Sequence, residues 1–410
     1  TKPPFWLVTP RTLSESATES MRTRRATLFL LLSSAATLLA QTAPKPLEPI
    51  TVKGSVLGAQ AAVDSPALLV GSAELARSSS NNIGDALGNL LGVANSQFGP
   101  NAGRPIVRGL DGDKVRVMQN GTAMLDASAA SPDHAVAVDP LSLREMQVFR
   151  GPSALLYSTS ILGGVVNLVD TRIAAHRMGV GATVQTRAGS VDSLASGGFK
   201  GWTTAGDWVV QADYFARSTE DLRTPVGRIA DTGSHSVGGG FGVSRLWDDG
   251  YVGVSWSNSV LDYGLSQGTL ILGQEHDRWE MAGEIRSDGL IRKAAWRAGL
   301  TDYVHGEVED GVVGSVFTSR GFDARLDLTL ARIGTTDGVI GVQGGSFDFD
   351  VTGAEAFLPR TTNRNSAVFG SFVTPLGDSG LRLRRGFRLQ RDAVLADAWE
   401  HLGIVSDTPA

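Results

Sequence analysis

An aspartate and a histidine stand side by side at Asp133 and His134, directly after Pro132. A carboxylate and an imidazole both bind zinc, and both can reach one ion if a loop presents them together. The competing interpretation is a histidine packed in the interior beside an aspartate that caps the next turn. We take the pair as candidate metal ligands that need partners from elsewhere in the chain.

Partner ligands are few, because the sequence holds only six histidines, and a tetrahedral zinc site needs three or four protein ligands. Three groups offer candidates: His305, Glu307 and Glu309; Glu355; and Glu275, His276 and Asp277, which we expect in a loop. Residues 305, 307 and 309 share one face if this stretch is a strand. For each group the competing interpretation is a solvated surface charge.

Composition narrows the classes of function. The 410 residues include no cysteine, which excludes disulfides, thiol catalysis and cysteine-bound metals. The net charge of −5 gives no electrostatic argument for nucleic acid as a partner. The sequence contains no H-E-x-x-H or P-loop motif, and an exported enzyme of unknown type is only a remote alternative.

The N-terminal region has the pattern of an exported protein. Residues 1–20 show no usable pattern and are interpreted as upstream read-through. Residues 21–40 begin with Met21, contain three arginines and continue as an uncharged apolar run, which is typical of a cleaved signal peptide. Residues 41–65 are interpreted as a flexible N-terminus. They contain a β-prone segment that could add a strand to a partner's sheet, namely Leu47, Glu48, Pro49, Ile50, Thr51 and Val52.

Residues 66–177 are expected to form a small α/β domain. Apolar residues recur at helical spacing over 83–91, after two asparagines that can cap a helix. Short strands are predicted at 105–108, 115–118 and 163–169, with turns at Asp111 and Gly112 and at Asn120 and Gly121.

Residues 178–383 show the alternation of strands that are apolar on one face and polar on the other. It is visible over 180–188, 208–217 and 293–301, and it is clearest over 322–330. Tryptophans near the strand ends suit a membrane interface. About ten or eleven strands are expected. After Leu383 the pattern breaks, so residues 384–410 are interpreted as an aberrant, partly helical tail.

Linked motifs over 104–126 and 143–169 resemble the plug domain of TonB-dependent outer-membrane receptors. The matching residues are Arg108, Gly109, Asn120, Gly121, Arg150, Gly151, Pro152, Leu156, Tyr157, Gly163, Gly164 and Asn167, with Gln147 where the family usually has an acidic residue. The resemblance implies a mainly β protein: an N-terminal α/β plug inside an antiparallel transmembrane β-barrel, which is incomplete in this chain. Such barrels have about 22 strands, so we expect a truncated form.

The resemblance also implies a function. The family takes up scarce nutrients across the outer membrane and binds no permanent cofactor. The segment 47–52 resembles the TonB box, on which the TonB–ExbB–ExbD complex pulls. Residues 131–136 resemble a plug loop of the family's zinc receptors, in which the Asp-His pair binds the metal. Zinc or another divalent metal is therefore the expected cargo, with Asp133, His134, His305, Glu307 and Glu355 as ligands. The alternative within the family is a haem or siderophore receptor, in which His134 could be an axial ligand.

Overall fold

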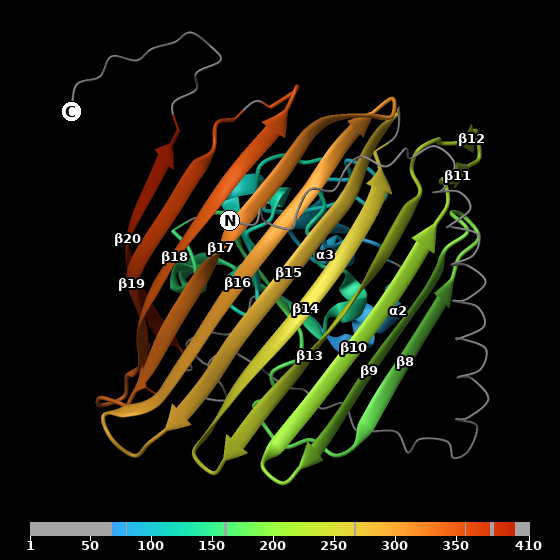
Figure 1. The fold of residues 1–410 in the computed structure, drawn as a ribbon. Helices are drawn as coiled ribbons and strands as arrows, with labels where there is room; N and C mark the ends of the chain where they lie inside the picture. The colour runs from blue at the N-terminus through green and yellow to red at the C-terminus, as the bar shows by residue number, and fades with distance from the viewer. Residues whose placement is uncertain are drawn as a thin grey trace, which may run out of the picture. The chain divides into compact units, whose positions relative to one another are not determined.

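The fold was analysed in a computed structural model, which describes residues 68–397 except 79, 160–161, 266–267, 357 and 378–380. Two β-sheets dominate this region: a small sheet of five strands and a large sheet of eleven. Figure 1 shows the large sheet as a row of long tilted strands, with the N-terminal elements behind it. The read-through, signal-peptide and TonB-box predictions all fall on residues outside the described region.

The small sheet has the strand order β1-β6-β7-β4-β5. Only β4 and β7 run parallel, while the other neighbours are antiparallel. The bounds are β1 Leu68–Val70, β4 Val115–Gln119, β5 Thr122–Ala123, β6 Glu145–Phe149 and β7 Gly164–Val169, with a separate β2–β3 pair at Val93–Asn95 and Pro105–Val107. The strands predicted at 105–108, 115–118 and 163–169 are therefore confirmed to within about a residue at each end.

Short helices fill the connections. They are α2 (Ser72–Arg77), α3 (Ile83–Leu87) and four 3-10 turns at Gly112–Lys114, Ala127–Ala129, Pro140–Ser142 and Gly151–Leu156. The side chain of Asn82 caps α3 by accepting from the N–H of Asp85, as the sequence predicts. None of the helices in the described residues has the length and apolarity that crossing a membrane requires.

Three of the predicted motif residues meet a backbone requirement. Asn120 and Gly121 both have positive φ, which forms the tight turn between β4 and β5. Gly163 lies against β4, where a Cβ would come within 2.3 Å of the Lys114 carbonyl oxygen. These residues shape the small domain.

The large sheet is an antiparallel meander in the order β20-β19-β18-β17-β16-β15-β14-β13-β10-β9-β8. Its strands are β8 Gly181–Ala188, β9 Ala195–Ala205, β10 Trp208–Thr219, β13 Ser234–Trp247, β14 Gly250–Gly264, β15 Thr269–Arg286, β16 Ile291–Glu309, β17 Val312–Leu330, β18 Asp337–Gly353, β19 Thr361–Pro375 and β20 Arg382–Ala396. A hairpin, β11 (Arg223–Thr224) with β12 (Gly227–Arg228), projects between β10 and β13. Within the described residues β8 and β20 do not pair, so the sheet is not closed into a barrel.

The strands of the large sheet continue past Leu383, where the sequence pattern predicts that they end. Residues 382–396 form β20, which pairs in register with β19 over its whole length. The arginines that interrupt the apolar pattern do not break the strand, because outward positions such as Leu383, Phe387 and Leu389 still alternate with inward ones such as Arg388 and Gln390.

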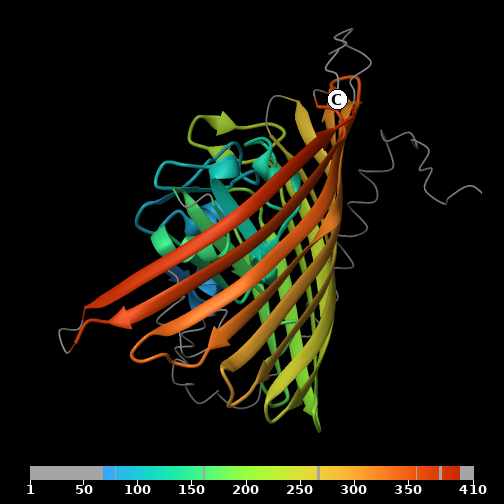
Figure 2. The ribbon, with the colours of Figure 1, turned by 90° about the vertical axis from the view of Figure 1, so that its left-hand side faces the viewer.

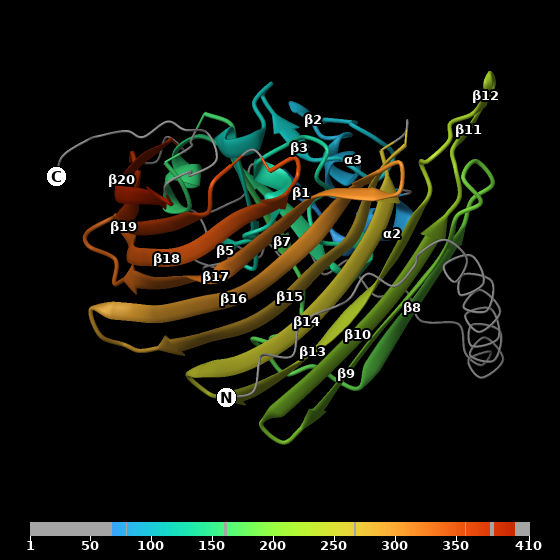
Figure 3. The ribbon, with the colours of Figure 1, turned by 45° about the horizontal axis from the view of Figure 1, so that its top comes forward.

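The large sheet encloses the small domain on its polar face. Figures 2 and 3 show the N-terminal elements against the concave side of the curved sheet. Buried charges join the two parts: Arg172 donates two hydrogen bonds to Asp213 of β10, at 2.8 and 2.9 Å, and Arg217 lies 3.0 Å from Asp139. The opposite face exposes apolar side chains, among them Trp279, Leu300 and Phe322.

Candidate functional site

The loop that carries Asp133 and His134 is held at both ends by the carboxylate of Asp126. Its Oδ1 accepts from the N–H and the hydroxyl of Ser128, at 3.2 and 2.7 Å, and its Oδ2 accepts from the N–H of Ala137 at 3.0 Å. Burial raises the pKa of Asp126 above 3.8, although these hydrogen bonds oppose the rise. The loop 127–136 therefore folds around one carboxylate.

His134 is buried and points toward the wall of the large sheet. Its Nδ1 lies 3.2 Å from the carbonyl oxygen of Ala127, which can only accept, so Nδ1 is the protonated nitrogen. Its Nε2 lies 2.8 Å from Oε1 of Glu307 and 3.9 Å from Oδ1 of Asp133. The ring nitrogen that is free of the backbone thus faces two carboxylates.

Strand β16 supplies the facing side chains. His305 and Glu307 are two residues apart and project to the same side, as predicted. A register shift between Glu307 and Val308 interrupts the alternation, and Glu309 is exposed, with its carboxylate hydrogen-bonded to Thr269. The bulge therefore ends the ligand pattern at Glu307.

Two buried atoms at this site have no hydrogen-bond partner. They are Nε2 of His305 and Oδ1 of Asp133. The other ring nitrogen of His305 lies 3.0 Å from the hydroxyl of Tyr303, which fixes the orientation of the ring, and Phe317 stacks on its face at 4.5 Å. Buried polar atoms normally have partners, so these two atoms are available to bind a ligand.

The donor atoms are close enough to share one ion. Ligand atoms of His134, His305 and Glu307 all lie within 4.8 Å of one another. Two ligands about 2.1 Å from a tetrahedral zinc are about 3.4 Å apart. To hold the ion, Nε2 of His134 and Oε1 of Glu307, now 2.8 Å apart, would separate slightly, and the wider pairs would move closer. Asp133 offers a fourth donor beside His134. The set of two imidazoles and two carboxylates suits a divalent metal of zinc type.

The protonation of His134 responds to this setting. Burial disfavours the imidazolium, but the hydrogen bond to Glu307 and the charge of Asp133 outweigh it and raise the pKa of His134 above 6.5. A proton on Nε2 therefore occupies the place that a metal would take.

Side chains of the large sheet hold the loop backbone on both sides of His134. The hydroxyl of Tyr263 donates to the carbonyl of Asp133 and accepts from the N–H of Ala135, both at 2.8 Å. Gln274 donates to the carbonyl of Ala135 at 2.9 Å. These contacts fix the loop to β14 and β15, so the candidate ligands are positioned before any ion arrives.

The group of His134, His305 and Glu307 does not include the other predicted candidates. Glu355 is exposed in the turn after β18, where its backbone N–H donates to the carbonyl of Gly314. The cluster expected in a loop lies instead on strand β15. There His276 faces inward, while Glu275 and Asp277 face outward, bonded to Asn258 and Trp256. A strand sends neighbouring residues to opposite faces, so this cluster cannot converge on one ion.

Tyr263, Tyr303 and Asp126 were not among the sequence candidates. Their roles depend on contacts across the fold, such as the 130 residues that separate Tyr263 from Asp133. Only Asp126 carried a local signal, since an aspartate two residues before a serine often caps a turn.

Comparison with known proteins identifies the small domain. Residues 59–165 match the family model of the TonB-dependent receptor plug domain. This range contains Asp133 and His134, together with most of the motif residues that carried the resemblance.

The described fold is similar to several solved metal transporters and receptors. The copper transporter OprC is 16% identical with a TM-score of 0.70, over 80% of this chain and 54% of that one. A mutant ferric enterobactin receptor, PfeA of Pseudomonas aeruginosa, is 13% identical with a TM-score of 0.64, over 81% and 58%. The FrpB iron transporter of Neisseria meningitidis is 10% identical with a TM-score of 0.64, over 79% and 57%. The chain thus spans little more than half the length of these transporters.

Proposed function

We propose, from the premise that this chain carries the plug domain of a TonB-dependent receptor, that it belongs to a receptor for the energised uptake of a divalent metal, with zinc as the cargo. The observation that carries the proposal is the group formed by His134, His305 and Glu307, with Asp133 beside it. Two of these residues come from the plug loop and two from β16. The ion is cargo, so no permanent cofactor is required.

The donor set favours a bare ion. His134 and His305 are each only 1% exposed, and a haem bound through either ring would need open space beside Nε2 for the whole macrocycle. The chain has no cysteine, which disfavours a copper(I) site built on thiolates. Imidazoles with carboxylates suit zinc, although the Irving–Williams order lets copper(II) compete in solution.

A siderophore receptor is the second candidate, because PfeA was solved with enterobactin and its fold is similar. A chelated iron already has its ligands, so such a receptor needs no convergent imidazoles and carboxylates. Nε2 of His305 and Oδ1 of Asp133 have no hydrogen-bond partner and could bind a metal directly. They therefore favour a receptor for a bare metal ion over a siderophore receptor.

The site suggests how release follows from pulling on the plug. An ion held by both pairs of ligands would join the plug loop to β16. Force applied by the TonB–ExbB–ExbD complex at segment 47–52 would move Asp133 and His134 away from His305 and Glu307. Affinity would then drop, because two ligands alone bind zinc weakly. In this proposal the receptor lies in the outer membrane, its sheet faces lipid, and a cleaved signal peptide directs its export.

Isothermal titration of the 410-residue chain in detergent tests the proposal. Zinc should bind one site, and His305→Ala should weaken binding more than about 100-fold, because removing a ligand costs more than removing its support. The control is Glu309→Gln, an exposed carboxylate two residues past Glu307, which should leave the affinity unchanged. Haemin and ferric enterobactin serve as competing ligands. Equal zinc binding by wild type and His305→Ala would contradict the proposed site.

A further inference from the structure

The outer face of the large sheet carries an aromatic row that ends abruptly. Direct cross-strand neighbours give the sequence Phe241, Trp256, Trp279, Leu300 and Phe322, from β13 to β17. On the next outward row, toward the loop that follows β18, the side chains are polar: Asn258, Asp277, Asp302, Arg320 and Asp348. Aromatic side chains between apolar and polar rows mark a membrane interface.

Beyond Phe322 the same cross-strand row is no longer aromatic. Its next members are Ser346 on β18 and Arg364 on β19. Arg391 on β20 lies diagonally next to Arg364, since its direct partner is Ser366. Both guanidinium groups are exposed on the outer face. Asp348, a carboxylate on the same face of β18, already accepts from Thr362 and Arg360. Arg364 therefore stands at the level of the aromatic row, where lipid headgroups lie, and Arg391 lies one row toward the apolar side.

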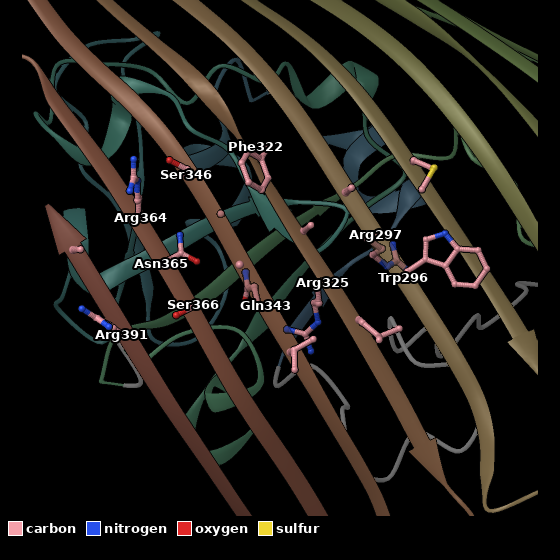
Figure 4. Close-up of a pocket in the computed structure, with 18 residues that line it drawn as sticks. Trp296, Arg297, Phe322, Arg325, Gln343, Ser346, Arg364, Asn365, Ser366 and Arg391 are labelled. Carbon is pink, nitrogen blue, oxygen red and sulfur yellow. The ribbon is translucent and has the colours of Figure 1, made fainter. Parts of the chain in front are cut away.

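A groove of about 940 Å³ leads from the two arginines across the outer face. Its floor is a row of small residues, Ala298, Ala324, Gly344 and Ser366, which are cross-strand neighbours in that order. Phe322 borders it on one side and Trp296, Leu326 and Val342 on the other. Met281, the cross-strand partner of Ala298, lies at the end of the floor. Figure 4 shows Phe322, Ser346 and Arg364 along one side of the groove, with Arg391 at its end.

We propose that this groove binds a phosphate-bearing anionic membrane lipid, with an acyl chain on the small-residue floor and the phosphate between Arg364 and Arg391. The inference requires the sheet to face lipid, as in the proposed function, but it does not involve the metal site. Arginine binds phosphate with a fork of N–H donors, and basic pockets on membrane proteins attract anionic headgroups. An arginine is tolerated near the membrane interface, whereas it is strongly disfavoured at the bilayer centre.

Native mass spectrometry of the 410-residue chain in detergent tests this site. The probes are palmitoyl-oleoyl phosphatidylglycerol, phosphatidylcholine with the same acyl chains, and inorganic phosphate. Wild type should retain phosphatidylglycerol in preference to phosphatidylcholine, and Arg364→Gln/Arg391→Gln should weaken that retention about tenfold. The matched control is Arg245→Gln/Arg385→Gln, which removes two exposed outer-face arginines far from the groove and should change retention less than twofold.

A second variant tests the groove without touching charge. A Cβ at Gly344 would meet only the carbonyl oxygen of Asn365, at 3.6 Å, so Gly344→Leu fits the fold and fills the floor. It should weaken phosphatidylglycerol binding at least fivefold. If inorganic phosphate binds as tightly as the lipid, or Gly344→Leu has no effect, no acyl chain occupies the groove. If Arg245→Gln/Arg385→Gln weakens phosphatidylglycerol retention as much as Arg364→Gln/Arg391→Gln, the interaction is nonspecific. Each of these results would overturn the proposal.

Discussion

At the scale of single residues, the candidate site is defined by atoms that lack partners. His305 uses one ring nitrogen on Tyr303 and leaves the other buried and unpaired. A buried polar atom without a partner costs about 1–3 kcal/mol. An ion bound at Nε2 of His305 would remove this cost.

Tyr263 is expected to control metal affinity without touching the metal. Tyr263→Phe removes the hydroxyl that joins the Asp133 carbonyl and the Ala135 N–H. Removal of such support for a ligand typically weakens metal binding by about 10–100-fold, so we expect a loss near tenfold by isothermal titration. Tyr214→Phe, at an exposed tyrosine on β10, is the control. A loss in the control as large as in Tyr263→Phe would argue against a positioning role.

The raised pKa of His134 predicts a pH dependence. Because the proton on Nε2 competes with metal, zinc affinity should begin to fall while the pH is still above 6.5, earlier than for an ordinary histidine. The folding stability of the metal-free protein should depend on pH in the opposite direction from zinc affinity. The raised pKa of His134 stabilises the fold at low pH, and this contribution disappears as the pH rises through that pKa. Histidine NMR titration measures the pKa directly. Glu307→Gln should lower it, because the hydrogen-bonded carboxylate is the main group that raises it.

At the scale of elements, a buried ion pair joins the segment after β7 to strand β10 of the large sheet. Arg172 is 5% exposed in its side chain and donates to both oxygens of Asp213. Asp213→Asn should destabilise the fold by about 2–3 kcal/mol, because it leaves a buried guanidinium partly unpaired. Asp207→Asn, which breaks the exposed pair with Arg177, should cost less than about 1 kcal/mol. Thermal denaturation of both variants in one detergent compares them, and equal losses would contradict the expectation.

The local sequence pattern predicts the strands better than it predicts which residues distant in the sequence come into contact. The alternation over 322–330 lies within β17, and the spacing of His305 and Glu307 places both on one face. The bulge at Glu307 and Val308 removed Glu309 from that face. Glu355 follows a strand and lies at an exposed turn, which no spacing rule indicates. The meeting of β16 with residues 133 and 134 came from the resemblance to a family, because a separation of 173 residues leaves no local signal.

At the scale of the whole molecule, the large sheet has two edges that do not pair with each other in the described residues. β8 and β20 each have one neighbour, whereas β16 and β17 are central. Strand edges exchange amide hydrogens faster than sheet interiors. Hydrogen–deuterium exchange of this chain in detergent should therefore show fast exchange in β8 and β20 and slow exchange in β16 and β17. Uniform protection across all four strands would mean that something covers both edges.

The metal site makes a prediction about the molecule as a unit, because its ligands come from two parts of the fold. An ion shared by the plug loop and β16 should slow amide exchange in 126–137 and in 303–309 together. It should also raise the unfolding temperature, since at 100 times its Kd a ligand adds about 2.7 kcal/mol to stability. His305→Ala should abolish both effects, while Glu309→Gln should keep them. If zinc protected only the strand, the ion would be bound without the plug, and pulling on the plug could not release it.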